Sequence, residues 1–294
     1  NDRLSSLSGY VRQVIPMTSN LDLLSEALFG LRTNGGSEYC GKVINTAVTD
    51  LAWSDNKEDL KIIFIAGNEA FNQGETTFQS ACRFAKDENI YVNTIFCGDY
   101  NTGINSFWKE GALLTSGNYS NINHNQVTSY VQTPYDDEIL KLNDELNDTY
   151  VYYGQEGKVA QQRMITQDNN AGVSSRGNKV ERSVYKSSKN YKSKKWDLVE
   201  QAEAAPEMLE DLDDDEFEAL ELPIQYKGMD KQELQVAIHG KAKKRQKIQA
   251  EINQLKVKRE TYLSSQKILK DNDLENAIIS SLKSQAISRG FDVK

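Results

Sequence analysis

The chain has 294 residues, of which 38% are hydrophobic and 27% charged, which suits a globular protein with room for one α/β domain and a further part. No apolar run approaches the roughly 20 residues that a membrane-spanning helix needs, so the sequence predicts no membrane span. The formal net charge of −8 argues against general binding to nucleic acid, which requires a basic face. Because the sequence begins at Asn1 and not at a methionine, we expect a mature or trimmed fragment. Its first residues therefore do not indicate the cellular compartment of the protein.

The first third of the chain alternates predicted strands and helices. Residues 9–18 alternate apolar with polar positions up to Pro16, which favours a strand near a sheet edge. Residues 19–31 begin with cap-type residues and place leucines on one helical face, and residues 35–53 carry an apolar stripe at helical spacing. This alternation predicts a parallel sheet with right-handed crossovers.

The stretch LKIIFIAGNEAFNQG, from Leu60 to Gly74, is an apolar run followed by a polar turn. Such a run is typical of a strand that helices cover on both faces. In α/β proteins, ligand groups usually follow the carboxyl end of such a strand, so the turn is a candidate binding loop. The other predicted elements here are a helix around 78–85, a strand at 90–99, a helix through 104–114 and a short strand at 118–122.

The character of the sequence changes after Pro134. Apolar residues recur at helical spacing over 135–153, and the text then becomes polar. A basic run and an acidic run follow each other, and we interpret the segments around 176–223 as basic and acidic linkers. The sequence thus predicts an α/β domain over 1–134 and an α-helical extension over 135–294.

A long charged helix is predicted near 230–268. Its apolar residues recur every seven positions, and the companion positions alternate isoleucine with arginine at Ile238, Arg245, Ile252 and Arg259. Because this seam is narrow and interrupted by charge, we favour packing on another helix of the same chain, with an intermolecular coiled coil as the alternative. A second helix at 273–288 is expected to supply the partner surface.

Three segments together resemble a known family. The succession LRTNGGSEYCGKVINTAVTDLAW, KIIFIAGNEAFNQG and IYVNTIFCGDY is similar to the central part of a von Willebrand factor A domain. More narrowly, it resembles a bacterial group of such proteins with a helical carboxyl-terminal extension. The resemblance covers about residues 10–130 and implies a Rossmann-like parallel sheet, here incomplete at its amino end, followed by the α-helical extension.

The resemblance also implies a metal site, built by three loops on the top face of the sheet. The first loop, an Asp-x-Ser-x-Ser motif, is missing from this chain. In the second loop, Ser37 falls at the ligand position after a glycine pair. In the third, Ala66 replaces an aspartate, so that only Asn68 or Glu69 could supply oxygen. The predicted metal ligands are therefore Ser37 and Asn68 in a degenerate site. We expect no cofactor, and Mg²⁺ only if the upstream motif is intact in the parent protein.

Several of these residues also have structural interpretations. Ser37 is a good candidate for the N-cap of the following helix, where Glu38 would favour the helix dipole. The three cysteines Cys40, Cys82 and Cys97 lack metal-type spacing, and both a disulfide with one free thiol and three buried thiols are allowed. The two histidines, at 124 and 239, are too far apart in the sequence to favour a zinc site.

We therefore predict a non-enzymatic protein that recognises another protein, outside the cytoplasm, in the periplasm or at the cell surface. No dinucleotide fingerprint, phosphate-binding loop or catalytic triad is present in the sequence. The expected contact face consists of the loops 35–40, 66–74 and 98–105. Its predicted partner-binding residues are Ser37, Glu38, Asn68, Glu69, Asn72 and Asp99. The alternative is a helical scaffold in a larger envelope assembly, with the α/β domain as a spacer.

Overall fold

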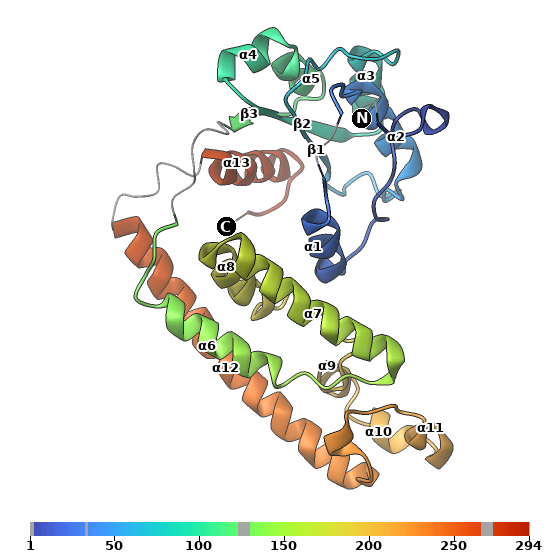
Figure 1. The fold of residues 1–294 in the computed structure, drawn as a ribbon, viewed down its shortest axis with the longest axis vertical. Helices are drawn as coiled ribbons and strands as arrows, with labels where there is room; N and C mark the ends of the chain where they lie inside the picture. The colour runs from blue at the N-terminus through green and yellow to red at the C-terminus, as the bar shows by residue number, and fades with distance from the viewer. Residues whose placement is uncertain (1–2, 33–34, 123–129, 266–272, 294) are drawn as a thin grey trace. The chain divides into compact units, whose positions relative to one another are not determined.

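The structure is a computed structural model that describes residues 3–32, 35–122, 130–265 and 273–293 (Figure 1). It is a mixed α/β chain of two compact units. The sheet unit comprises residues 1–17, 31–128 and 270–294, and the helical unit comprises residues 18–30 and 129–269. The predicted division at residue 134 therefore needs correction, because one short segment from each side belongs with the other unit.

A three-stranded parallel sheet organises the sheet unit. The strands are β1 (Lys61–Gly67), β2 (Ile90–Cys97) and β3 (Tyr119–Ile122), in the order β1-β2-β3. Helix α3 (Phe78–Asp87) connects β1 to β2, and helices α4 (Tyr100–Asn105) and α5 (Trp108–Leu114) connect β2 to β3. The predicted parallel α/β arrangement is confirmed at this level.

The apolar core of the sheet unit lies on one face of the sheet. Helices α2 (Cys40–Asp50), α3 and α5 contribute to it, and its fully buried side chains include Ile44, Phe71, Phe78 and Trp108. These helices form because their apolar residues recur every three or four positions, so that one stripe faces the sheet. The helical periodicity of the sequence therefore predicted this face correctly.

The opposite face of the sheet is covered differently (Figure 1). Helix α13 (Asp273–Ser288) packs there, and the Gln285 side chain exchanges two hydrogen bonds with Asn93, of 2.8 and 3.1 Å. This helix was expected to pack on the long charged helix, and that expectation is wrong. The strand β1 is also less enclosed than predicted: it lies at the sheet edge and Phe64 is 39% exposed.

Two local predictions in the sheet unit are wrong for backbone reasons. Residues 9–18 form no strand, and the described residues before them, 3–8, include a 3-10 turn, Ser6–Ser8. Gly9 and Tyr10 both have left-handed φ values, of 64° and 63°, which break an extended run. The helix expected through 104–114 is divided into α4 and α5 because Phe107, with a φ of 72°, turns the chain between them.

The helical unit contains no strand among its described residues. Its elements are α1 (Leu21–Phe29), α6 (Asp136–Asn147), α7 (Gly154–Ser174), α8 (Arg176–Lys186), α9 (Leu198–Ala204), α10 (Met208–Asp211), α11 (Asp214–Glu218), the 3-10 turn Ile224–Tyr226 and α12 (Lys231–Ser265). None of the helices that the structure describes has both the length and the apolar character that crossing a bilayer requires.

The segments interpreted as linkers are folded, which corrects the prediction for 176–223. Helix α8 buries Val180 and Val184, which are one helical turn apart within a polar stretch. In the acidic part, Leu209 is 1% exposed and packs in a core with Leu234 of α12. Charged residues far outnumber these few apolar residues in both runs. The composition therefore suggested a linker, although the apolar residues pack in a core.

Helix α12 has the predicted seven-residue seam, and it packs on α6 and α9 of the same unit. The intramolecular interpretation is thus confirmed, while residues 266–268 of the predicted helix lie outside the described residues. The two arginines of the seam are buried in ion pairs: Arg245 lies 2.5 Å from Asp197, and Arg259 lies 3.0 Å from Asp136. Both arginines of the seam are therefore matched by an acid on a neighbouring segment, whereas Lys241, which breaks the seven-residue repeat, donates to the main-chain oxygen of Asp148.

A second group of buried charges, which we call the ion cluster, joins α1, α7 and α8. It consists of the buried residues Asp22, Asp168 and Lys186 together with the partly buried Arg182, all within the helical unit. Arg182 bridges the two aspartates at 2.6 Å each, and the Lys186 ammonium lies 2.6 Å from Asp168. Asp22 is the only buried residue of α1, so this charge explains why α1 belongs to the helical unit.

Candidate functional site

The loops 35–40, 66–74 and 98–105, the last of which includes α4, belong to the sheet unit, and we call them together the rim. Because β1 and β2 run parallel, the turns that follow Gly67 and Cys97 lie at the same end of the sheet. The loop before α2 reaches this end as well, since the Glu38 amide donates a 2.7 Å hydrogen bond to the Gln73 side chain. The structure therefore brings together the loops that the sequence predicted as a contact face.

Glu38 is the residue that connects two of these loops. Its Oε2 accepts hydrogen bonds from the main-chain amides of Asn68, at 3.1 Å, and Glu69, at 3.3 Å. A side chain at Gly67 would place its Cβ 2.1 Å from the same oxygen, so only glycine permits this approach. The amides of the turn after β1 are thus occupied by a carboxylate of the chain itself.

Trp108, a buried residue of the core, contacts the rim through its indole group. Its indole N–H donates a 2.8 Å hydrogen bond to the main-chain oxygen of Glu69, and its ring is fully buried beside Phe71 and Phe96. The main-chain oxygen of Trp108 in turn accepts a 2.8 Å bond from the Thr94 hydroxyl. Sequence reasoning placed Trp108 on a helix but missed this contact, because residues far apart in the chain form it.

A shallow depression of about 470 Å³ lies where β2 ends. Its lining residues are Asn68, Phe96, Cys97, Gly98, Asp99 and Thr102. Two of the predicted partner-binding residues, Asn68 and Asp99, therefore meet at one place. A side chain at Gly98 would bring its Cβ within 2.6 Å of the Phe96 ring, so the glycine lets this buried ring pack against the main chain.

Asp99 caps helix α4 with one of its two carboxylate oxygens. Oδ1 accepts bonds from the amides of Asn101 and Thr102, at 3.0 and 2.9 Å, and from the Thr102 hydroxyl, at 3.1 Å. The hydrogen bonds from Thr102 lower the pKa of Asp99, because they stabilise the charged form. The carboxylate is therefore ionised at neutral pH. Cap geometry of this kind is visible in sequence as an aspartate before a polar turn.

The other predicted residues contribute less to this arrangement. Ser37 is half-buried and lies two residues before Tyr39, which is the N-cap of α2 and makes no side-chain cap bond. The expectation that Ser37 caps this helix is therefore wrong. Asn72 is exposed in the turn after β1, and Glu69 is half-buried, with a 3.4 Å contact from the Asn68 amide group. Asn72 is thus an accessible marker of the rim loop.

The three cysteines are free thiols, so the disulfide alternative is wrong; Cys40 and Cys82 are buried as the other alternative expected, whereas Cys97 is only partly buried. Burial raises the pKa of Cys40 and of Cys82 to about 12, and burial together with the nearby Glu38 charge raises the pKa of Cys97. These thiols are protonated at neutral pH and are weak nucleophiles. Of the two histidines, His124 lies outside the described residues and His239 is exposed on α12.

The rim residues do not fit a magnesium site. A magnesium ion prefers about six oxygen ligands in an octahedron, whereas Glu38 holds two main-chain amides and Asp99 holds a helix cap. Among the residues that the structure describes, no group of three or more His, Cys, Asp or Glu is placed to hold a metal ion. Ser37 and Asn68 as metal ligands thus remain a prediction, and no step below depends on a metal.

No family model, curated protein or solved structure matches the chain. The resemblance to von Willebrand factor A domains is therefore a prediction from the sequence motifs alone. What the rim does has to be argued from its own contacts and charges.

Replacing Glu38 with alanine is expected to loosen the rim and to lower the free energy of unfolding of the sheet unit by about 1–3 kcal/mol, because two amides lose a charged acceptor. Hydrogen exchange at Asn68 and Glu69 would accelerate. Glu38→Gln keeps an acceptor oxygen and should recover part of the loss, while Glu69→Gln serves as the matched control. Unchanged exchange at both amides in Glu38→Ala would contradict this account of the rim.

Proposed function

We propose that the chain recognises another protein by docking it on the rim of the sheet unit, without catalysis. The observation that carries this proposal is the way Glu38 and Trp108 hold the turn after β1 in place from two sides. A loop held by such contacts presents its outer side chains in one arrangement, which reduces the entropy that a partner must overcome on binding. The exposed residues Asn68 and Asn72 would then supply polar contacts.

The chemistry of the rim supports docking over catalysis. Its carboxylates at Glu38 and Asp99 each hold main-chain amides, and the Cys97 thiol has a raised pKa. A nucleophile or general base needs a partner within hydrogen-bond reach that adjusts its proton affinity. The Thr102 hydroxyl donates to the Asp99 carboxylate at 3.1 Å, but the lowered pKa of Asp99 makes that carboxylate a weak base.

The proposal has three further parts. The domain is of the von Willebrand factor A type, the protein acts outside the cytoplasm, and docking on the rim does not use a metal ion. They rest on the sequence resemblance and on the poor fit of the rim residues to magnesium. The scaffold alternative receives less support, because the α12 seam is occupied by α6 and α9 of its own chain and is not available for an intermolecular coiled coil.

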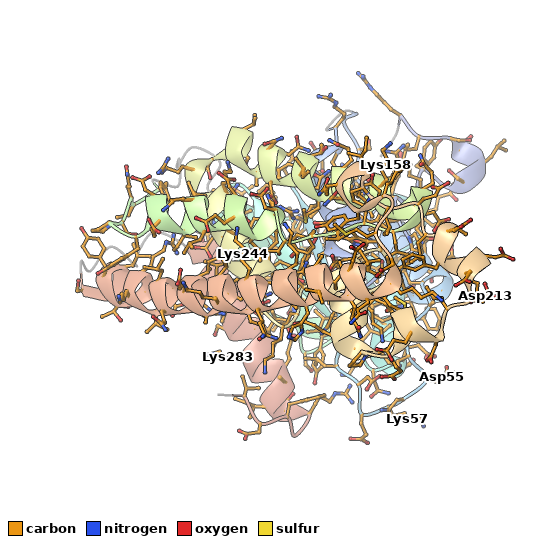
Figure 2. The ribbon with its side chains drawn as sticks, turned by 90° about the horizontal axis from the view of Figure 1, so that it is seen from below. Asp55, Lys57, Lys158, Asp213, Lys244 and Lys283 are labelled. Carbon is orange, nitrogen blue, oxygen red and sulfur yellow. The ribbon has the colours of Figure 1, made fainter. Side chains whose placement is uncertain are left out.

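A photo-crosslinking experiment tests the proposal. A photoreactive phenylalanine analogue is placed at Asn72 in the full chain and, as a control, at Asp55, which is exposed in the loop before β1 (Figure 2). In extract from the source cells we expect one adduct of defined mass from position 72, lost when Glu38→Ala is added, and none from position 55. The same adducts from both positions, or an adduct at 72 that survives Glu38→Ala unchanged, would contradict docking on the rim.

A further inference from the structure

We propose that the outer face of helix α12 binds the acidic segment 207–221 of a second copy of this chain. This outer face, which we call the lysine face, consists of the exposed side chains of Lys243, Lys244, Lys247, Lys256 and Lys258. Residues 207–221 are called the acidic segment below. Both surfaces lie in the helical unit, so this inference goes beyond docking on the rim and does not depend on it.

The lysine face is a basic surface that the fold leaves largely unpaired. Residues 241–258 include seven lysines and arginines and one acid, Glu251. Lys243, Lys244 and Lys258 form no ion pair with any described residue. The other two lysines of the face pair with acids one turn further along α12, at 3.9 and 3.8 Å, and exposed pairs of this kind contribute little. The face therefore keeps most of its positive charge.

The acidic segment is complementary to this face. Nine of its fifteen residues are aspartate or glutamate, none is lysine or arginine, and all nine acids are exposed. Among the described residues, the one cation paired with them is Lys231, which lies 3.2 Å from Asp214. Like charges gathered in this way repel one another and destabilise the compact state. A cationic surface of a second molecule would relieve this repulsion.

The lysine face of the same molecule is too far away to do so. Lys231, which pairs with Asp214, lies in the first turn of α12 and also donates a 2.6 Å hydrogen bond to a main-chain oxygen of the acidic segment. Lys244 lies 13 residues further along the helix, which corresponds to about 20 Å at 1.5 Å per residue. Figure 2 shows Lys244 along α12 and Asp213 near one end of that helix.

A second copy fits the lysine face better than a nucleic acid does. Every sample of the chain contains the acidic segment at the same concentration as the lysine face. A nucleic acid, which is negative along its whole length, would also meet the other acids of a chain whose formal net charge is −8. Both surfaces also offer an exposed aliphatic side chain, Ile224 just after the acidic segment and Val257 between two lysines, and apolar contacts of this kind favour a protein interface.

The contact between two copies is head-to-tail, because the two surfaces differ from each other. Each copy can offer its lysine face to one neighbour and its acidic segment to another. Contacts of this type build an open chain of molecules, or a ring if the rotation between neighbours closes.

Sedimentation velocity of the full chain tests whether copies associate. We expect the mean sedimentation coefficient to rise with protein concentration at about 0.01 M salt, where charges act over about 30 Å. At about 1 M salt, where they act over about 3 Å, the rise should disappear. A chain that stays monomeric at low salt would overturn the inference, and so would association that is unchanged at high salt.

Two sets of neutral substitutions test the surfaces. The lysine-face variant combines Lys243→Gln, Lys244→Gln and Lys247→Gln. The acidic-segment variant combines Asp211→Asn, Glu218→Gln and Glu221→Gln, and none of these acids caps a helix or forms an ion pair. Each variant alone should associate about tenfold more weakly, which is the combined effect of a few exposed ion pairs. The matched control Lys158→Gln, an exposed lysine of α7, should associate like the unmodified chain (Figure 2).

Mixing the two variants gives the decisive result. Each variant keeps one intact surface, so the mixture should form complexes of two molecules and nothing larger, which also shows that both variants are folded. A mixture that remains monomeric would overturn the inference. Loss of association in Lys158→Gln equal to that in the lysine-face variant would overturn it as well. A monomeric chain that binds a short DNA duplex through the same lysines would assign this face to nucleic acid instead.

Discussion

The Asp168→Ala variant is expected to lose about 3–5 kcal/mol of unfolding free energy in the helical unit, because removing one partner of a buried ion pair leaves the opposite charge uncompensated. Lys186 is fully buried 2.6 Å from this carboxylate, and Arg182 contacts its other oxygen at 2.6 Å. Urea unfolding, followed by hydrogen exchange in α7 and α8, measures the loss. Exchange in the sheet unit should remain close to that of the unmodified chain.

A double variant provides the control for this prediction. Asp168→Leu combined with Lys186→Met removes both charges and fills the space with apolar groups. Such replacements of buried pairs are often neutral, so the double variant should be more stable than Asp168→Ala. Arg182 keeps Asp22 as its partner in that variant. A single variant within about 1 kcal/mol of the unmodified chain would show that water reaches the cluster and screens it.

The same cluster makes the helical unit sensitive to acid. Burial opposes the ionisation of Asp168, but Lys186 and Arg182 outweigh it and lower the pKa of this carboxyl. A carboxyl whose pKa is lowered on folding contributes stability above its unfolded pKa, about 3.9, and this stability is lost as the pH falls through the folded pKa. The cost of Asp168→Ala should therefore shrink below about pH 4.

The Trp108→Ala variant is expected to destabilise the sheet unit by about 3–5 kcal/mol, since it removes a buried aromatic side chain and leaves a cavity. The ring is completely buried, with Phe71 and Phe96 at centroid distances of 4.8 and 5.7 Å. The variant also removes the hydrogen bond to the main-chain oxygen of Glu69. Urea unfolding monitored by hydrogen exchange at β1 and β2 measures the effect.

The control for this prediction separates packing from the hydrogen bond. Trp108→Phe keeps an aromatic ring in the core but cannot donate to Glu69. It should cost less than the alanine variant and still accelerate exchange in the turn after Gly67. If both variants leave exchange in that turn unchanged, the contact from Trp108 does not hold the rim, and the account of the site would need revision.

Much of the sheet unit was predictable from its sequence because local patterns and tertiary packing agree there. The apolar run before Gly67 and the run that ends at Cys97 both form parallel strands, and the stripe through Ile44 packs on them. The placement of 273–288 was not predictable, since its contact with the sheet depends on the amide pair of Asn93 and Gln285. Polar pairs of this kind leave no periodic signal.

The helical unit shows more clearly which structural features cannot be predicted from the sequence. Helices α7 and α8 combine the apolar core residues Met164, Val180 and Val184 with the buried charges of the ion cluster, and the charged sequence around 176–223, which includes α8, was interpreted as linker. At the rim, the loop positions followed from the ends of the strands. The contacts of Glu38 with Gln73 and with the amides after Gly67 did not, because they join residues about 30 positions apart or more.

The alternation of isoleucine and arginine along α12 has a consequence for motion. Sliding this helix by one heptad would move Arg245 into the place of Ile238 or Ile252, and a charge would face an apolar surface without an acid. One-turn ratchets, which some proteins use to transmit signals along helices, face a similar penalty here. If α12 moves, we therefore expect α6 and α9 to move with it as one rigid body.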